Sequence, residues 1–340
     1  MKKRTFLAAI PGAVAALALG PLATAAQAQS QTLLNASYDV AREFYKDYNA
    51  AFTAYWKKTT GKDVRIDQAH GGSSKQARAV SDGLPADVVT MNQATDIDFL
   101  ASKNMVSADW RKAYPDNAAP TTSTSIFLVR TGNPKNIKDW NDLIRPDVKV
   151  VIVNPKLGGN GRATWLAAWG HIKKAGGSDA QAAEFVGKLL KNVAVMDAGG
   201  RAATGTFLQR NVGDVLITFE SEVITIDQEF GEGKVDPVYP SSSLLVENPV
   251  AVVQPVVAKK GTQELAQAYL KFLWSPEAQQ IAAKHWLRPR SAEVLKANAS
   301  RFKPIKLFTV DEVFGSSAKA QETHFKDGGE FDRIYKSIQP

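Results

Sequence analysis

Glycines and short polar residues at the starts of predicted helices carry the clearest chemical signal in this sequence. The stretch from Asn154 to Arg162 contains three glycines, follows the apolar run Val150 to Val153 and precedes a helical pattern from Ala163 to Lys174. A helix start has unpaired N–H groups and a partial positive charge, and glycine lets a ligand approach the backbone closely. The stretch therefore predicts an anion site made of backbone groups.

Three further turns have the same form, in which a predicted strand ends just before a helix begins. Their helix starts are Asp39, Ser73 and Gly200. Asp39 and Ser73 have the residue types of helix caps, and an ordinary cap or turn is the competing interpretation for each. An anion site shared by the four turns requires that the fold bring them to one point.

Residues suited to other chemistry are sparse. The chain has no cysteine, and its four histidines, His70, His171, His285 and His324, show no paired spacing for a metal ion. Ser73 has no evident base in the sequence, and a nucleophile needs one. The basic residues are scattered among acidic ones, which is not the basic stripe of a nucleic-acid-binding protein. We therefore predict no catalytic residue, no metal site, no cofactor and no nucleic-acid partner.

Strands alternate with helices along the whole chain, which predicts an α/β fold with mostly parallel sheets. The length favours two domains. Ser125 to Val129 is predicted as the strand that crosses into the second domain, and Pro249 to Val257 as the strand that returns. We expect domain 1 to comprise residues 29–124 and 249–340, and domain 2 residues 125–248. Ligands in such sheets bind beyond the carboxyl ends of strands, so the cleft between the domains is the expected site.

The N-terminal segment has the pattern of an export signal. Lys2, Lys3 and Arg4 precede an apolar run from Phe6 to Leu22, and a small-x-small cleavage pattern ends at Ala28. We predict that residues 1–28 are a signal peptide and that the rest is a periplasmic monomer. Loss of the three basic residues reduces the formal net charge from +8 to about +5.

Four segments in register, spread from about residue 32 to about residue 290, resemble the periplasmic sulfate- and thiosulfate-binding proteins. They are Asn35 to Glu43, His70 to Ala77, Asn154 to Arg162, and Asp197 to Arg201 together with Gly213 to Ile217. The resemblance implies a two-domain periplasmic-binding-protein fold of type II, whose ligand lies in the interdomain cleft. It also implies that the protein delivers its ligand to the membrane permease of an ABC importer.

The resemblance assigns the ligand, a dehydrated tetrahedral oxyanion, mainly to backbone N–H groups. Carried onto this sequence, the donors are the N–H groups of Asp39, Ser73, Gly159, Asn160 and Gly200. The sequence departs from the sulfate binders at two donors, since Gly158 stands in place of a serine and Phe219 in place of a tryptophan. Each missing donor to a charged ligand costs roughly 1.5–3 kcal/mol unless another group replaces it.

Several groups could offset these losses. Ser74, Thr218 or a water molecule could donate instead, or the ligand could need fewer donors. The terminal sulfur of thiosulfate is a weaker acceptor than oxygen, and a phenyl ring such as that of Phe219 suits it. Phe219 followed by Glu220-Ser221-Glu222 also resembles the thiosulfate-binding branch. We expect a receptor for both anions, with Phe219 as an ordinary core residue the open alternative.

Two arginines near the turns are expected to support the site without contacting the anion, because a direct ion pair would slow its release. We expect Arg42 and Arg162 to bind carboxylates or carbonyls behind the donors, with Asp39 as a partner for Arg42. A site built only of donors should reject phosphate, which keeps a proton that needs an acceptor. The alternatives are a receptor of similar fold for molybdate or another oxyanion, and a secreted hydrolase or sulfur transferase.

Overall fold

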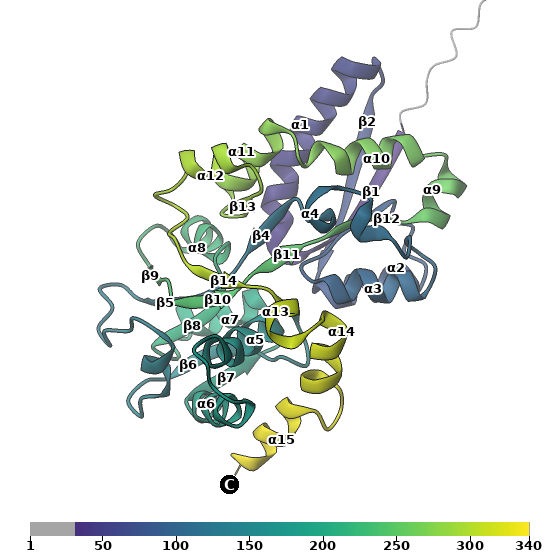
Figure 1. Ribbon diagram of the computed structural model, residues 1–340. Helices are drawn as coiled ribbons and strands as arrows, with labels where there is room; N and C mark the ends of the chain where they lie inside the picture. Colours follow the sequence, from purple (N-terminus) through teal and green to yellow (C-terminus); the bar gives the residue numbers. More distant parts are fainter. Residues whose placement is uncertain (1–30, 340) are drawn as a thin grey trace, which may run out of the picture.

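The computed structural model describes residues 31–339, so the predicted signal peptide lies outside the described residues. The described chain forms two lobes, each built around its own sheet (Figure 1). Helices cover both faces of each sheet, in agreement with the predicted α/β class. In the described part of the chain, no helix is both long and apolar enough to cross a membrane.

The first lobe contains a four-stranded sheet in the order β12-β3-β1-β2. Strands β1, β2 and β3 are parallel, and β12 runs antiparallel to β3. Neighbouring residues on a strand face opposite sides, so Val88 packs with one layer of helices and Val89 with the other. The strands are β1 (Gln31–Tyr38), β2 (Val64–Gly71), β3 (Val88–Thr90) and β12 (Val250–Val252).

Helix α1 buries a row of aromatic side chains in the core of the first lobe. Phe44, Tyr48, Phe52 and Trp56 recur at helical spacing, and all four are buried against the sheet and its neighbouring helices. Gly61 ends the helix in the left-handed conformation, with φ 73°, which glycine adopts without strain. The helical elements of this lobe are η1 (Asp39–Ala41), α1 (Arg42–Thr60), α2 (Ser73–Ser81), α3 (Ala94–Ser102), η2 (Trp110–Lys112), α4 (Pro115–Ala118), α9 (Gln254–Lys260), α10 (Gln263–Phe272), α11 (Pro276–Lys284) and α12 (Ala292–Ala297).

The second lobe contains a five-stranded sheet in the order β7-β6-β8-β5-β9. Strands β7, β6 and β8 are parallel, whereas β5 pairs antiparallel with both β8 and β9. The strands are β5 (Ser125–Arg130), β6 (Val150–Val153), β7 (Val193–Asp197), β8 (Val215–Phe219) and β9 (Val235–Val238). The helices between them are η3 (Trp140–Ile144), α5 (Gly159–Lys174), α6 (Asp179–Lys191), α7 (Gly200–Leu208) and α8 (Glu222–Phe230).

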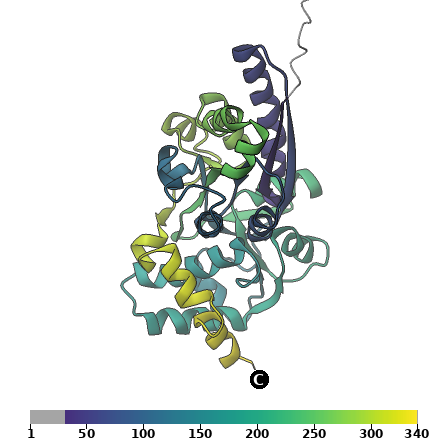
Figure 2. The same cartoon turned by 90° about the vertical axis from the view of Figure 1, so that its right-hand side faces the viewer.

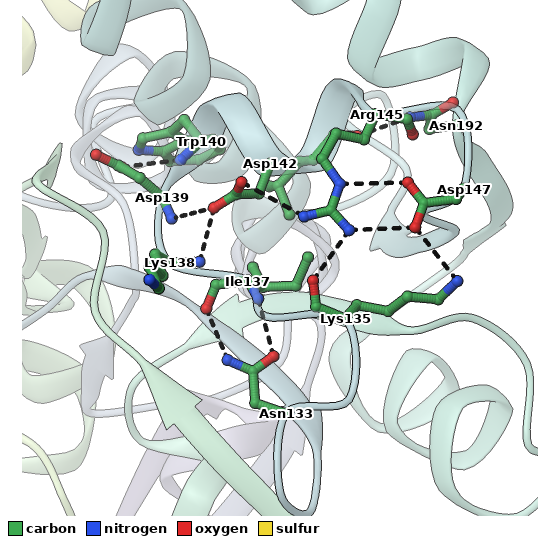
Figure 3. Close-up of polar contacts among 11 residues, drawn as sticks. Asn133, Lys135, Ile137, Lys138, Asp139, Trp140, Asp142, Arg145, Asp147 and Asn192 are labelled. Atoms are coloured by element: carbon green, nitrogen blue, oxygen red, sulfur yellow. Dashed lines mark hydrogen bonds and ion pairs between the residues drawn. The ribbon is translucent and has the colours of Figure 1, made fainter.

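A polar network fixes the loop that leads into β6 (Figure 3). Asp139 and Asp142 form a reciprocal capping box at the start of η3, and Asn133 bonds both backbone groups of Ile137. Asn192, just after α6, donates to the backbone oxygens of Leu143 and Arg145. Buried polar groups are stable when paired in this way, so β6 begins at a defined place and directs its other end toward the glycine-rich turn.

Short strands connect the lobes. β4 (Thr121–Ser123) pairs antiparallel with β11 (Val246–Asn248) and with β13 (Arg288–Pro289), and these strands lie between the two large sheets (Figure 1). β10 (Ser242–Leu244) pairs in parallel with β14 (Lys306–Phe308). The chain therefore passes between the lobes at several adjacent segments, an arrangement suited to a hinge.

The C-terminal segment lies along the second lobe, as both views show (Figures 1 and 2). Phe308, Phe314, Phe325 and Phe331 are buried in the same cluster as Trp165 and Trp169 of α5. We expected residues 249–340 to belong entirely to domain 1; this packing leads us to propose that the part from β14 onward belongs to domain 2. Its helices are α13 (Val310–Phe314), α14 (Ser317–Ala320), the π-helical η4 (Gln321–Phe325) and α15 (Glu330–Ser337).

Candidate functional site

The start of α5 shows why its turn contains glycine at particular positions. A Cβ atom on Gly161 would lie 2.4 Å from the backbone oxygen of Val153, so this glycine lets the helix pack directly on the end of β6. A Cβ atom on Gly159 would lie 2.6 Å from Oδ1 of Asn92, in the first lobe. The helix start therefore lies against the opposite lobe at a distance that only glycine permits.

The first-lobe side of this contact is the segment between β3 and α3. Gln93 donates from Nε2 to Ser74 Oγ and to Asp96 Oδ2, each at 2.8 Å. Its Oε1 accepts a hydrogen bond of 3.1 Å from Nη1 of Arg162 on α5. Gln93 thus connects the start of α2 to the start of α5 across the two lobes.

The sequence predicts that the side chain of Ser73 caps α2, but in the structure it does not. Gly72 occupies the N-cap position, and Ser73 Oγ instead donates to Asp96 Oδ2 at 2.5 Å. Ser74 Oγ donates to the other carboxylate oxygen of Asp96 at 2.8 Å. Because both hydroxyls are held by Asp96, the start of α2 is fixed while its first N–H group stays available.

The contacts of Asp39 and Arg42 also differ from those predicted. Tyr38 is the N-cap residue, and the carboxylate of Asp39 accepts only from the adjacent N–H of Val40, at 3.0 Å. Arg42 forms no ion pair with Asp39 or with any other acid among residues 31–339. The end of β1 is held instead by His70, whose Nδ1 lies 3.1 Å from the backbone oxygen of Tyr38. Burial lowers the pKa of His70, which favours a neutral ring.

Arg162 binds a carbonyl oxygen, one of the two kinds of partner that we had expected for it, but this oxygen belongs to the side chain of Gln93 in the other lobe. Arg162 thereby reaches the other lobe, and its Nε is buried without a hydrogen-bond partner in the described chain. Burial lowers the pKa of its guanidinium, with Asp96 acting in the opposite direction.

The start of α7 lies beside α5 and α8. The side chain of Asn160 donates from Nδ2 to Thr218 Oγ1 at 2.8 Å, so Thr218 positions this amide. A Cβ atom on Gly200 would lie 3.8 Å from that same Nδ2 and 3.5 Å from Oε1 of Glu222. Glu222 is completely buried, and its pKa is raised to about 7, mainly by burial and secondly by the charge of Asp39. The four predicted helix starts are therefore neighbours in one continuous arrangement.

Backbone N–H groups remain free at this place. Within residues 31–339, the N–H groups of Ser73, Gly159 and Gly200 have no acceptor, since the first residues of a helix lack intrahelical partners. Four buried side-chain atoms around them are also unpaired in the described chain: Asn92 Oδ1, Asn160 Oδ1, Arg162 Nε and Glu222 Oε1. Because buried unpaired polar atoms are rare and costly, their concentration indicates a binding site for a small polar ligand.

Phe219 and Gly158, the two positions without a predicted side-chain donor, have different surroundings. Phe219 is 2 % exposed and packs in the core on the α5 face of the sheet. Its environment is that of a core residue, the alternative left open by the sequence. A Cβ atom on Gly158 would lie 3.3 Å from Cγ1 of Val153, a tight fit for any side chain.

Comparison with known proteins identifies the chain. The family of bacterial extracellular solute-binding proteins matches residues 33–288. The chain belongs to this family. A protein from Pseudomonas aeruginosa named thiosulfate-binding protein is 56% identical over 98% of this chain and 99% of its own. A protein from Escherichia coli named sulfate-binding protein is 52% identical over 92% of this chain and 96% of its own.

A solved structure agrees with these relatives. The sulfate-binding protein SubI from Mycobacterium tuberculosis has a TM-score of 0.78 and 30% identity, over 87% of this chain and all of its own. The predicted resemblance to the sulfate- and thiosulfate-binding proteins is confirmed, and with it the two-domain fold of type II.

The sequence analysis did not identify three residues near the start of α5 as part of the candidate site. They are Asn92, Gln93 and Asp96. Asn92 and Gln93 also line a cavity of about 490 Å³ between α3, α5 and the C-terminal segment. Their signal in the sequence is modest: the polar pair Asn92 and Gln93 comes after the short strand Val88 to Thr90, with only Met91 in between. Polar residues after a strand are common in loops, so only the contact with α5 distinguishes them.

Proposed function

We propose that this protein captures sulfate or thiosulfate between its two lobes and delivers it to the membrane permease of an ABC importer. The observation that carries the proposal is that helix starts from both lobes lie close to one another, and that within residues 31–339 the N–H groups of Ser73, Gly159 and Gly200 have no acceptor. Oriented backbone dipoles of this kind stabilise an anion without an ion pair. The names of the relatives from Pseudomonas aeruginosa and Escherichia coli point to the same two anions.

The proposed ligand-binding residues are those expected from the sequence, Asp39, Ser73, Gly159, Asn160 and Gly200, with Gly158 and Phe219 adjacent. Asn92 and Gln93 join them as residues that hold the lobes together around the ligand. We further propose that residues 1–28 direct export to the periplasm and that the protein acts there as a monomer without catalysis.

Calorimetric titration of the protein from residue 29 onward tests this function directly. Sulfate, thiosulfate, molybdate and phosphate are added separately. We expect saturable binding of one sulfate or one thiosulfate per protein. Phosphate keeps a proton that needs an acceptor, and the backbone donors offer none, so phosphate should bind only if the unpaired Oδ1 of Asn92 or of Asn160 accepts that proton. If molybdate binds more tightly than sulfate and thiosulfate, the protein is a molybdate receptor. If none of the four anions binds, the proposal is refuted.

The preference between the two sulfur anions is expected to depend on Phe219. Phe219→Trp adds an indole N–H near the proposed site and should raise the affinity for sulfate relative to thiosulfate. Because Phe219 is fully packed, the larger ring is expected to cost about 1–3 kcal/mol of folding free energy. The ratio of the two affinities, measured on folded protein, is therefore the decisive quantity; an unchanged ratio contradicts a role of this position in selectivity.

A further inference from the structure

Glu222 is a buried acid that lacks the partners a buried acid usually has. It is the first residue of α8, it is completely buried, and Thr204 Oγ1 donates to its Oε2 at 3.2 Å. Its Oε1 has no hydrogen-bond partner within the described chain. No basic side chain forms an ion pair with it in the described chain either, in contrast to nearby Glu220, which pairs with Arg288 at 2.6 Å. A fully buried carboxylate without a cation is strongly disfavoured in its charged form.

The unpaired oxygen points to the helix starts that bind the proposed anion. Oε1 lies 3.5 Å from the position of a Cβ atom on Gly200, next to the side-chain amide of Asn160. The unpaired Oε1 of Glu222 therefore lies beside Gly200, whose own N–H group has no acceptor in the described chain. An anion held at the start of α7 would contact both groups.

The charged groups around Glu222 do not neutralise it. Asp39 faces it from η1, Arg201 from α7, and Glu229 from its own helix α8. Arg201 already pairs with Glu229 at the surface, so its charge is shared. Burial and the charge of Asp39 raise the pKa of Glu222 to about 7. A dianion at Gly200 would add further negative charge and favour the protonated carboxyl still more.

We propose that Glu222 is a ligand-binding residue of the anion site and binds in its protonated form, with its carboxyl O–H donating a hydrogen bond to the bound oxyanion. The proposal rests on the function proposed above. Gly158 and Phe219 stand where the sulfate binders have side-chain donors to the anion. The protonated carboxyl of Glu222 can replace one of these missing donors, whereas a carboxylate can only accept. The proposal also makes anion binding dependent on a proton.

The sign of this dependence follows from linkage. Below pH 7 the free protein already holds the proton on Glu222, so anion affinity should be nearly independent of pH. Above pH 7 the free protein must take up one proton for each anion bound. Affinity should then fall as pH rises, approaching about tenfold for each pH unit. Sulfate itself stays a dianion throughout, so its own ionisation does not contribute.

The test is titration of the full mature protein with sulfate and with thiosulfate between about pH 6 and about pH 9. We expect the wild-type dissociation constant to rise about tenfold over the last pH unit. Glu222→Gln keeps an N–H donor of similar shape and cannot ionise, so its dissociation constant should stay nearly constant across this range. Glu232→Gln is the matched control, because it removes an exposed acid just after the same helix that is not among the charges around Glu222; it should keep the pH dependence of the wild type.

A second measurement on the wild-type protein covers the case in which Glu222→Gln does not fold. Titrations at about pH 8 in two buffers with different ionisation enthalpies count the protons taken up, and we expect a value approaching one per anion. No proton uptake together with a flat pH profile would overturn the role of Glu222 and leave the proposed function intact. Failure of the wild type to bind sulfate or thiosulfate at any pH would instead refute the proposed function.

Discussion

At the scale of single residues, Gly159, Gly161 and Gly200 are each needed for a different steric reason. Gly161 lets α5 pack on the end of its own strand, whereas Gly159 lets the helix start approach the other lobe. Gly200 leaves space beside the carboxyl of Glu222. None of the three has a positive φ, so close approach and not backbone conformation explains the glycine at each position.

Gly159→Ala is predicted to weaken anion binding without unfolding the protein. The added methyl group would meet Asn92 Oδ1 at 2.6 Å and Gln93 Oε1 at 3.2 Å, so the lobes could not close fully on the ligand. We expect the dissociation constant for sulfate or thiosulfate to rise at least about tenfold, or about 1.4 kcal/mol. Gly205→Ala on α7 is the control, since its Cβ atom would make only an ordinary contact at 3.6 Å; equal affinities of the two variants would contradict the prediction.

Glu222 also predicts how the stability of the free protein depends on pH. Its pKa rises from 4.5 in the unfolded chain to about 7 in the folded protein. Between these values the folded state holds a proton that the unfolded state releases, so stability falls as pH rises, by about 3 kcal/mol in all. Chemical denaturation should show that Glu222→Gln gains stability over the wild type on going from about pH 5 to about pH 8. A constant difference between the two proteins would refute this linkage.

At the scale of elements, the C-terminal segment supports α5, whose start belongs to the proposed site. Trp165 of α5 donates from Nε1 to Nδ1 of His324 at 3.2 Å. Lys156, in the turn before α5, donates to the backbone oxygen of Phe325 and pairs with Asp327 and Asp332 at 3.0 Å each. Residues far apart in sequence thus hold the glycine-rich turn and its helix in place.

Lys156→Ala should loosen this support. Exposed ion pairs contribute little, but this lysine is half-buried and also bonds a backbone oxygen, so we expect a loss of about 1 kcal/mol. Hydrogen exchange should become faster in the turn and in residues 325–337, and anion affinity should decrease. Lys173→Ala removes a lysine whose ion pair is with Asp179 and should change neither quantity; exchange rates unchanged by Lys156→Ala would argue against a supporting role.

At the scale of the whole molecule, the two lobes meet around the site and are joined by short strands beside it. The buried pair of Arg288 on β13 and Glu220 after β8 anchors one of these connections. Arg162 and Gln93 form a contact directly across the site. A solute-binding protein that releases its ligand must break such a contact, so its strength should set how long the ligand stays.

Gln93→Ala is therefore predicted to speed ligand release. It removes the acceptor of Arg162, which is the contact between the lobes, and also the bonds from Gln93 to Ser74 and Asp96, which position Gln93 within the first lobe. We expect the dissociation rate of the anion to rise about tenfold, with a much smaller change in the association rate. Stopped-flow kinetics measure both rates, with Gln209→Ala, an exposed position at the end of α7, as control. A change confined to the association rate would contradict this prediction, because it would show that the contact already exists in the transition state for binding.

The sequence by itself determined the α/β class and the four helix starts at Asp39, Ser73, Gly158 to Asn160 and Gly200. These features are local, because apolar periodicity and glycine turns depend on neighbouring residues. Tertiary structure alone decided what surrounds those starts: Asn92 and Gln93 facing Gly159, the reach of Arg162 across the lobes, the C-terminal segment on α5, and Glu222 beside Gly200. Each of these features depends on burial and on contacts between distant parts of the chain. Burial also shifts the pKa of Glu222. A pattern of neighbouring residues therefore could not reveal these features.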